Sequence, residues 1–150
     1  MYRIHIQTET KRVFVPSANK IKHWAKAALR HKRRRGELTV RLVTPREIQA
    51  LNKTYRHKDK PTNVLSFRAE MPKAVRLQYP LLGDLVICSA IVNEEAGCQG
   101  KTPEAHWAHI VIHGALHLLG YDHETEVEAR VMEGKEIRLL KTLGFSNPYS

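Results

Sequence analysis

Three histidines in the C-terminal third of the chain have the spacing of a metal site. His113 and His117 are four residues apart, so on a helix their imidazoles lie one above the other on the same face. Gly120 allows the chain to leave that helix in a left-handed conformation, after which His123 can return to the same point. Three imidazoles with no fourth ligand nearby in sequence are typical of an open, catalytic zinc site rather than a closed structural one. We therefore expect these three histidines to bind one Zn²⁺ ion per chain.

The spacing H-x3-H-x5-H, with glycine three residues after the second histidine, is also that of the metzincin peptidases. Those peptidases carry a general-base glutamate directly after the first histidine, and this chain has Gly114 there. Glycine cannot accept a proton from a water molecule on the metal. The sequence therefore predicts the metal scaffold of a peptidase without the base that peptide hydrolysis requires.

A row of histidines along one helix could instead be a polar face with no ligand role. The helix around His113 and His117 is apolar on nearly all its other faces, which predicts that it is buried and that its histidines need partners. A metal ion would supply them. His106 lies about 10 Å before His113 at 1.5 Å per residue, too far to share an ion with His117. His109, one turn before His113, is expected beside the site rather than as a ligand.

Three segments of the chain resemble the bacterial YbeY family. They are Leu51 to Phe67 (L-N-K-T-Y-R-H-K-D-K-P-T-N-V-L-S-F), Leu82 to Cys88 (L-G-D-L-V-I-C) and His113 to His123, and their order and spacing agree with the family over about residues 38 to 143. The resemblance implies a single-domain, zinc-dependent endoribonuclease specific for single strands, occupying residues 1–150. It further implies a role in ribosomal RNA processing, including maturation of the 3′ end of 16S RNA, and in ribosome quality control. Ribosomal RNA and the small ribosomal subunit would then be its partners.

The resemblance also implies a catalytic role for Arg56 beside the three histidines. An arginine is always charged and can grip a phosphate with two parallel N–H groups, so it could share with the metal the stabilisation of charge at phosphorus. Two positions depart from the family pattern. Asn63 stands where aspartate is more frequent, and Lys53 where arginine is common. The departure at residue 63 leaves the role of that position open.

The sequence does not identify the general base. Asp59, Asp84 and Glu94 are candidates that it does not rank, and a metal-bound hydroxide acting unaided is a further alternative. Asp122 is either a turn residue or a carboxylate that orients a ligand imidazole. Two other functions stay open. One is a metal hydrolase of another class, such as an amidase or peptidase, and the other is a non-catalytic RNA-binding or ribosome-assembly factor with structural zinc.

The composition favours a cytoplasmic protein with a polyanionic partner. Among 150 residues, 25 basic side chains stand against 15 acidic ones, and the formal net charge of +10 favours RNA. The chain has no run of 18 apolar residues, and its start lacks the pattern of a signal peptide, so we expect no membrane association. Cys88 and Cys98 are expected to be free thiols. The oligomeric state is left open.

Two stretches concentrate the positive charge. Residues 30–35 read R-H-K-R-R-R and are either a solvated loop or part of an RNA-binding surface. Residues 56–60 read R-H-K-D-K and lie inside a segment of the family resemblance, so we expect them to have a functional role.

Strand and helix patterns alternate along the chain. Strands are predicted at residues 2–7, 38–42, 64–67 and 84–88, with residues 11–15 extending or pairing with the first. Helices are predicted at residues 18–31, 45–55, 90–96, from 103 onward and at 124–143, and the predicted caps are Ser17, Thr44, Ser89 and Thr102. Residues 71–79 are expected to be irregular. This order predicts an α+β (α/β layered) fold, with one mixed sheet of about four strands, about five helices, and the zinc site at the end of a buried helix.

Overall fold

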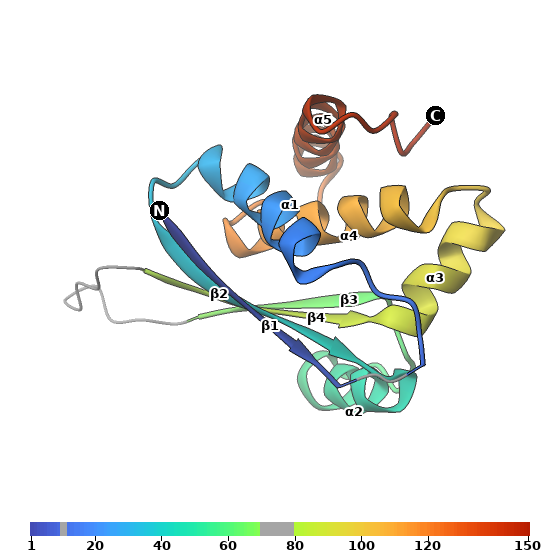
Figure 1. Cartoon of the computed structure of the whole chain (residues 1–150). Helices are drawn as coiled ribbons and strands as arrows, with labels where there is room; N and C mark the ends of the chain where they lie inside the picture. Colours follow the sequence, from blue (N-terminus) through green and yellow to red (C-terminus); the bar gives the residue numbers. More distant parts are fainter. Residues whose placement is uncertain (10–11, 70–79) are drawn as a thin grey trace.

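One mixed β-sheet and five helices make up the described part of the protein (Figure 1). The computed structural model describes residues 1–9, 12–69 and 80–150. The sheet order is β1-β2-β4-β3, with β1, β2 and β4 parallel and β3 antiparallel to β4, which confirms the predicted α+β fold. In chain order the elements are β1 (Tyr2–Thr8), α1 (Ala18–Arg30), β2 (Gly36–Val43), α2 (Pro45–Arg56), β3 (Val64–Arg68), β4 (Leu81–Cys88), α3 (Ser89–Cys98), α4 (Pro103–Leu118) and α5 (Glu126–Thr142).

The sheet separates two hydrophobic layers because successive strand residues point to opposite faces. On β4, Leu85 and Ile87 belong to the large core that includes residues of α1 and α4. Val86 and Cys88 belong to a smaller core with Ile48 of α2. In Figure 1, α1 and α4 accordingly lie on one side of the sheet and α2 on the other. Helix α4 contacts β3, β4, α1, α3 and α5, so it is the central helix of the fold.

Gly114 lets α4 lie close to the sheet. A Cβ atom at this position would be 2.8 Å from Leu85 Cδ2 and 3.4 Å from Val64 Cγ2. The hydroxyl of Ser66 on β3 donates to Gly114 O at 3.1 Å, which ties the same turn of the helix to the edge strand. The position that holds the base in the peptidases therefore faces a packed contact in this chain, and glycine has a packing role there.

The predicted helix caps are confirmed at three of four positions. The side-chain oxygens of Ser17, Thr44 and Thr102 each accept an N–H group from the first turn of their helix. The prediction for Ser89 is wrong, because β4 runs directly into α3 and Cys88 occupies the N-cap position without a side-chain hydrogen bond. Ser89 is instead the first helical residue, and its hydroxyl has no partner among the described residues.

Two further segments differ from the prediction. Residues 12–15 are irregular rather than part of a strand, and residue 11 and the segment 71–79 lie outside the described residues. The last helix begins at Glu126, because Thr125 caps it in a reciprocal capping box with Glu128.

Both cysteines are free, as expected, with Cys88 buried and Cys98 exposed. No helix within the described ranges combines the length and apolar character needed to span a membrane.

Candidate metal centre

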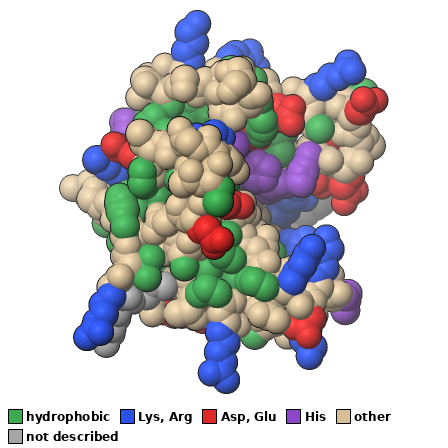
Figure 2. All heavy atoms as spheres, turned by 90° about the vertical axis from the view of Figure 1, so that its right-hand side faces the viewer, with side chains coloured by type: hydrophobic (Ala, Val, Ile, Leu, Met, Phe, Trp, Pro, Cys, Tyr) green, Lys and Arg blue, Asp and Glu red, His purple; other side chains and the backbone are tan. Residues whose placement is uncertain are grey.

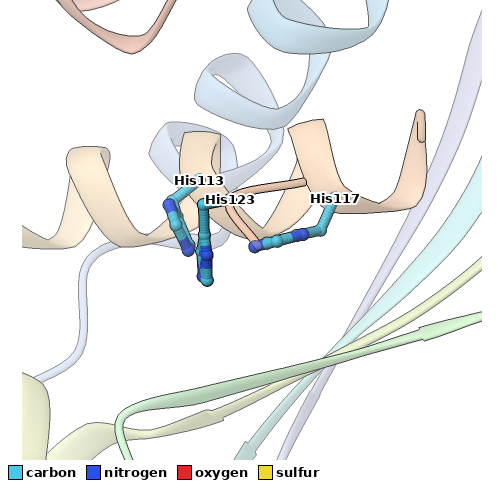
Figure 3. Close-up of side chains that lie close together, drawn as sticks. All are labelled: His113, His117 and His123. Carbon is cyan, nitrogen blue, oxygen red and sulfur yellow. The ribbon is translucent and has the colours of Figure 1, made fainter. Parts of the chain in front are cut away.

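The imidazoles of His113, His117 and His123 converge on one side of α4 (Figure 3). The ring centroids of His113 and His117 are 4.7 Å apart, and that of His123 lies 5.5 Å and 4.8 Å from them. One nitrogen of each ring lies within 4.8 Å of a nitrogen on each of the other two. His113 and His117 are partly buried, with side chains 23% and 18% exposed, whereas His123 is exposed. The group can therefore be reached from solvent.

A glycine turn brings His123 back to the helix. Gly120 has a φ of +104°, which favours glycine, and its N–H donates to His117 O at 3.0 Å. The next N–H, that of Tyr121, donates to Leu116 O at 3.1 Å. These two bonds form a Schellman motif, which satisfies the last carbonyls of α4 while it reverses the chain. The reversal that the spacing predicts is therefore present, and it is fixed by local hydrogen bonds.

The buried carboxylate of Glu136 on α5 contacts the imidazole of His113 through Nδ1. Glu136 Oε2 lies 3.3 Å from His113 Nδ1, and Oε1 lies 2.6 Å from His109 Nε2 and accepts the Tyr149 hydroxyl at 2.8 Å. Since Nδ1 of His113 faces this carboxylate, its Nε2 is left for a metal. The sequence reasoning missed Glu136. A signal was available, because Glu136 is the one acidic residue in the buried stripe of α5, which consists of Met132, Glu136 and Leu140.

Asp122 is a turn residue, and no hydrogen bond joins its carboxylate to a ligand imidazole among the described residues. Its Oδ1 accepts the N–H of His123 at 3.0 Å, which stabilises the turn, and lies 4.0 Å from Nδ1 of His117. His109 lies beside the site, as expected, through its contact with Glu136. The atoms of His109, His113 and Glu136 also lie close enough together to hold an ion, but Glu136 is only 1% exposed and contacts of hydrogen-bond length account for this grouping.

Burial and neighbouring charges set the protonation of the group. Burial lowers the pKa of His117 to about 4, and the nearby His113 and His123 act in the same direction. Its imidazole is therefore neutral at pH 7, which is the form that binds a metal. Burial alone would raise the pKa of Glu136, but hydrogen bonds from His109 and His113 lower it to about 2 overall. Glu136 thus carries a buried negative charge beside His109 and His113.

His106 belongs to a separate cluster with Glu95 and Asn63. Its Nε2 lies 2.9 Å from Glu95 Oε1, and Asn63 Nδ2 donates to both oxygens of the same carboxylate at 3.1 and 3.3 Å. An aspartate at position 63 would place a second negative charge beside Glu95. Asn63 therefore has a structural role, as a hydrogen-bond donor that connects the residue before β3 to α3.

Two arginines lie along the edge strand β3. Arg56 Nη2 donates to Ser66 O at 2.8 Å, and its guanidinium carbon lies 5.8 Å from the centre of the Phe67 ring. Within the described residues, Arg56 makes no hydrogen bond to the three histidines. Arg68, which the sequence reasoning missed, donates through Nε to His117 O at 2.8 Å. Figure 2 shows histidine side chains in a hollow of the surface, with Lys or Arg side chains near its edge.

The three carboxylates considered as bases lie elsewhere. Asp59 accepts a hydrogen bond from Gln49 of α2 at 3.0 Å. Asp84 points away from α4, because the next residue along β4, Leu85, packs against Gly114. Glu94 is exposed on α3. Within the described ranges, the acidic side chains that lie within 4.0 Å of a histidine of α4 are Glu95, Glu136 and Asp122.

The chemistry of the three-histidine group fits a zinc ion. Imidazole nitrogens are preferred zinc ligands, and Nδ1 of His113 lies at hydrogen-bond distance from a carboxylate, an arrangement that fixes the tautomer of a ligand histidine. In the described part of the chain, no fourth histidine, cysteine or acidic residue joins the group. Three protein ligands leave a coordination position for solvent or substrate.

Comparisons with known proteins agree with this architecture. The family model described as Endoribonuclease YbeY matches residues 3–144. A protein of Nitrosococcus oceani named Endoribonuclease YbeY is 49% identical over 146 residues, which cover 97% of this chain and 95% of that protein. The solution structure of TM1509 from Thermotoga maritima aligns with a TM-score of 0.61 and 28% identity, over 94% of this chain and 87% of that one. On this evidence the chain belongs to the YbeY family.

Proposed function

We propose that this protein is a zinc-dependent endoribonuclease in which His113, His117 and His123 hold one zinc ion. The observation that carries the proposal is the convergence of these imidazoles in a chain that is 49% identical to a protein named Endoribonuclease YbeY. Residues 1–150 would act as one domain. The peptidase alternative is disfavoured, because Gly114 supplies no base and faces the sheet.

The residues around the group suggest a division of tasks. When bound, the zinc ion supplies a Lewis acid that polarises a phosphoryl oxygen. Glu136 keeps the imidazole of His113 oriented, and Asp122 stabilises the turn that carries His123. Arg56 and Arg68 both lie on the side of β3, and a guanidinium there can bind a phosphate oxygen pair and stabilise its growing charge.

The proposed substrate is single-stranded ribosomal RNA, with maturation of the 3′ end of 16S RNA and ribosome quality control as the cellular roles. The small ribosomal subunit would be the partner and the cytoplasm the location. The family membership and the net charge of +10 support a polyanionic substrate of this kind.

Metal analysis combined with RNA cleavage tests the proposal. Wild-type protein free of host nuclease should carry about one zinc per chain and cleave single-stranded RNA, and His117→Ala should lose both properties. His23→Ala, at an exposed position on α1, is the control and should retain both. Equal cleavage by wild type and His117→Ala would contradict the proposal, as would chelator-sensitive hydrolysis of casein without RNA cleavage. If a chelator unfolds the protein, the ion is structural.

Single-turnover cleavage at saturating protein tests the role of Arg56. Arg56→Ala should lower the cleavage rate of bound RNA while the zinc content stays unchanged. Arg56→Lys should restore only part of the rate, because a point charge does not reproduce a bidentate fork. Equal rates for wild type and Arg56→Ala would assign Arg56 to binding alone.

A further inference from the structure

A cluster of basic side chains lies where the end of α1 meets α5, and the proposed metal centre does not use it. Lys135 Nζ lies 2.7 Å from His31 Nε2, which connects α5 to the segment after α1. The charge of Arg138, also on α5, acts on the same histidine. We define the basic face as these residues together with the predicted basic stretch, namely His31, Lys32, Arg33, Arg34, Arg35, Lys135 and Arg138.

The positive charge of the basic face is not balanced by acidic groups. In the described ranges, none of its six lysines and arginines forms an ion pair. Lys135 instead contacts an imidazole, and burial together with the charges of Lys135, Arg138 and Lys32 lowers the pKa of His31. Other cations of the chain do have acidic partners, such as Lys20 with Glu104 at 2.7 Å. Such an unbalanced surface favours a polyanion.

The basic face adjoins the loop that carries His123. Lys32 Nζ donates to Leu119 O at 3.1 Å, and Lys32 and Lys135 lie 5.0 Å and 5.2 Å from the centre of the Tyr121 ring. Tyr121 is two residues before His123, so their Cα atoms are at most about 7 Å apart. A strand that covers this ring therefore reaches the three histidines within a few nucleotides.

We propose that the basic face is a second phosphate-binding surface, which holds the RNA backbone beside the segment that enters the metal centre. The inference rests on the proposed function, since it gives the same RNA strand an additional contact. Contacts to phosphate position a strand without reading its sequence. The basic face therefore contributes affinity and orientation, whereas the metal centre contributes the reaction.

The structure indicates which side chains can be changed without damage to the fold. Lys32 is excluded as a test position, because its Nζ donates to the carbonyl oxygen of Leu119, at the start of the turn that leads to His123. Arg33 and Arg34 accept hydrogen bonds from Tyr2 and the terminal amino group only through their backbone carbonyls, so a new side chain leaves those bonds in place. We therefore choose Arg34→Gln, Arg35→Gln and Arg138→Gln as one triple variant, all at exposed positions.

The control variant removes the same number of positive charges elsewhere. It combines Arg12→Gln, Lys20→Gln and Arg46→Gln, which are exposed and lie before α1, on α1 and on α2. Both variants should keep the zinc content and urea unfolding of the wild type. Binding is measured with a long unstructured 2′-O-methyl RNA, which resists cleavage through the 2′-hydroxyl, and with a trinucleotide, over a range of salt concentrations.

The salt dependence of binding decides the proposal. For single strands, each lost phosphate contact reduces the slope of the logarithm of the binding constant against the logarithm of the salt concentration by about 0.7 in magnitude. The basic-face variant lacks three arginines, so its slope on the long RNA should be smaller in magnitude than that of the wild type by about 2. The control variant should keep the wild-type slope, and trinucleotide binding should be unchanged in both. An unchanged slope in the basic-face variant, or an equal loss in the control, would overturn the inference. Failure of the wild type to bind either RNA would instead refute the proposed function.

Discussion

The negative charge of Glu136 should govern zinc affinity through His113. Three donors point at this carboxylate, namely His109 Nε2, His113 Nδ1 and the Tyr149 hydroxyl. In Glu136→Gln, an amide of nearly the same shape offers one accepting oxygen and one NH₂ group. At least one of the three groups then loses its accepting oxygen, and the ligand imidazole loses the charge that fixes its orientation.

The expected effect follows from two magnitudes. A hydrogen bond to a charged group contributes about 1.5–3 kcal/mol. Loss of the partner behind a ligand histidine typically lowers metal affinity by about 10- to 100-fold, which corresponds to about 1.4–2.7 kcal/mol. Since the two ranges overlap, we expect the zinc affinity of Glu136→Gln to fall by about 10- to 100-fold. Because Glu136 is 1% exposed, solvent should not replace the lost contact.

Competition with a colorimetric chelator measures this change directly. Glu133→Gln is the matched control, because it removes one negative charge from an exposed position of the same helix and should bind zinc as the wild type does. Urea unfolding in the presence of a chelator verifies that both variants are folded before metal is added. If folded Glu136→Gln binds zinc with an affinity within about twofold of the wild-type value, the carboxylate does not position His113 and the reasoning fails.

Three further predictions concern packing, charge and pH. Gly114→Ala should lower the free energy of unfolding by about 1–3 kcal/mol, because the added methyl group would lie 2.8 Å from Leu85 Cδ2 in a packed contact. Urea unfolding measures this loss, and unchanged stability would mean that α4 shifts freely. Asn63→Asp should destabilise the fold by about 1–3 kcal/mol at pH 7, because a donor to Glu95 becomes a like charge. Because neighbouring like charges raise the pKa values of carboxyl groups, the loss of stability in Asn63→Asp should be smaller at pH 5 than at pH 7 in thermal unfolding. An equal loss of stability at the two pH values would contradict this explanation. In the metal-free protein, the pKa of His117 is lowered from 6.5 to about 4, so the unfolded state binds more protons between these values. The free energy of unfolding of the metal-free protein should therefore fall as the pH drops from 6.5 towards about 4. His117→Asn should weaken that fall in chelator-treated urea titrations, and an identical pH profile would refute the assignment.

The part of the site that was predictable lies within eleven consecutive residues. Helical periodicity places His113 over His117, and the left-handed turn at Gly120 returns the chain, so the relative positions of the three imidazoles depend on local geometry alone. The sheet and most helix boundaries were predictable for the same reason, since alternation and caps are also local patterns. The cap predicted at Ser89 failed where a strand meets a helix without a linker.

The surroundings of the site could not be predicted in this way, because they join residues that are far apart in the chain. His113 and Glu136 are 23 positions apart, Asn63 and Glu95 32, and Arg68 and His117 49. Each contact depends on which faces of two distant elements meet, and that is decided by the packing of the whole core around α4. The sequence alone determined the three converging histidines, whereas the tertiary structure decided which carboxylates support them and which arginines stand beside them.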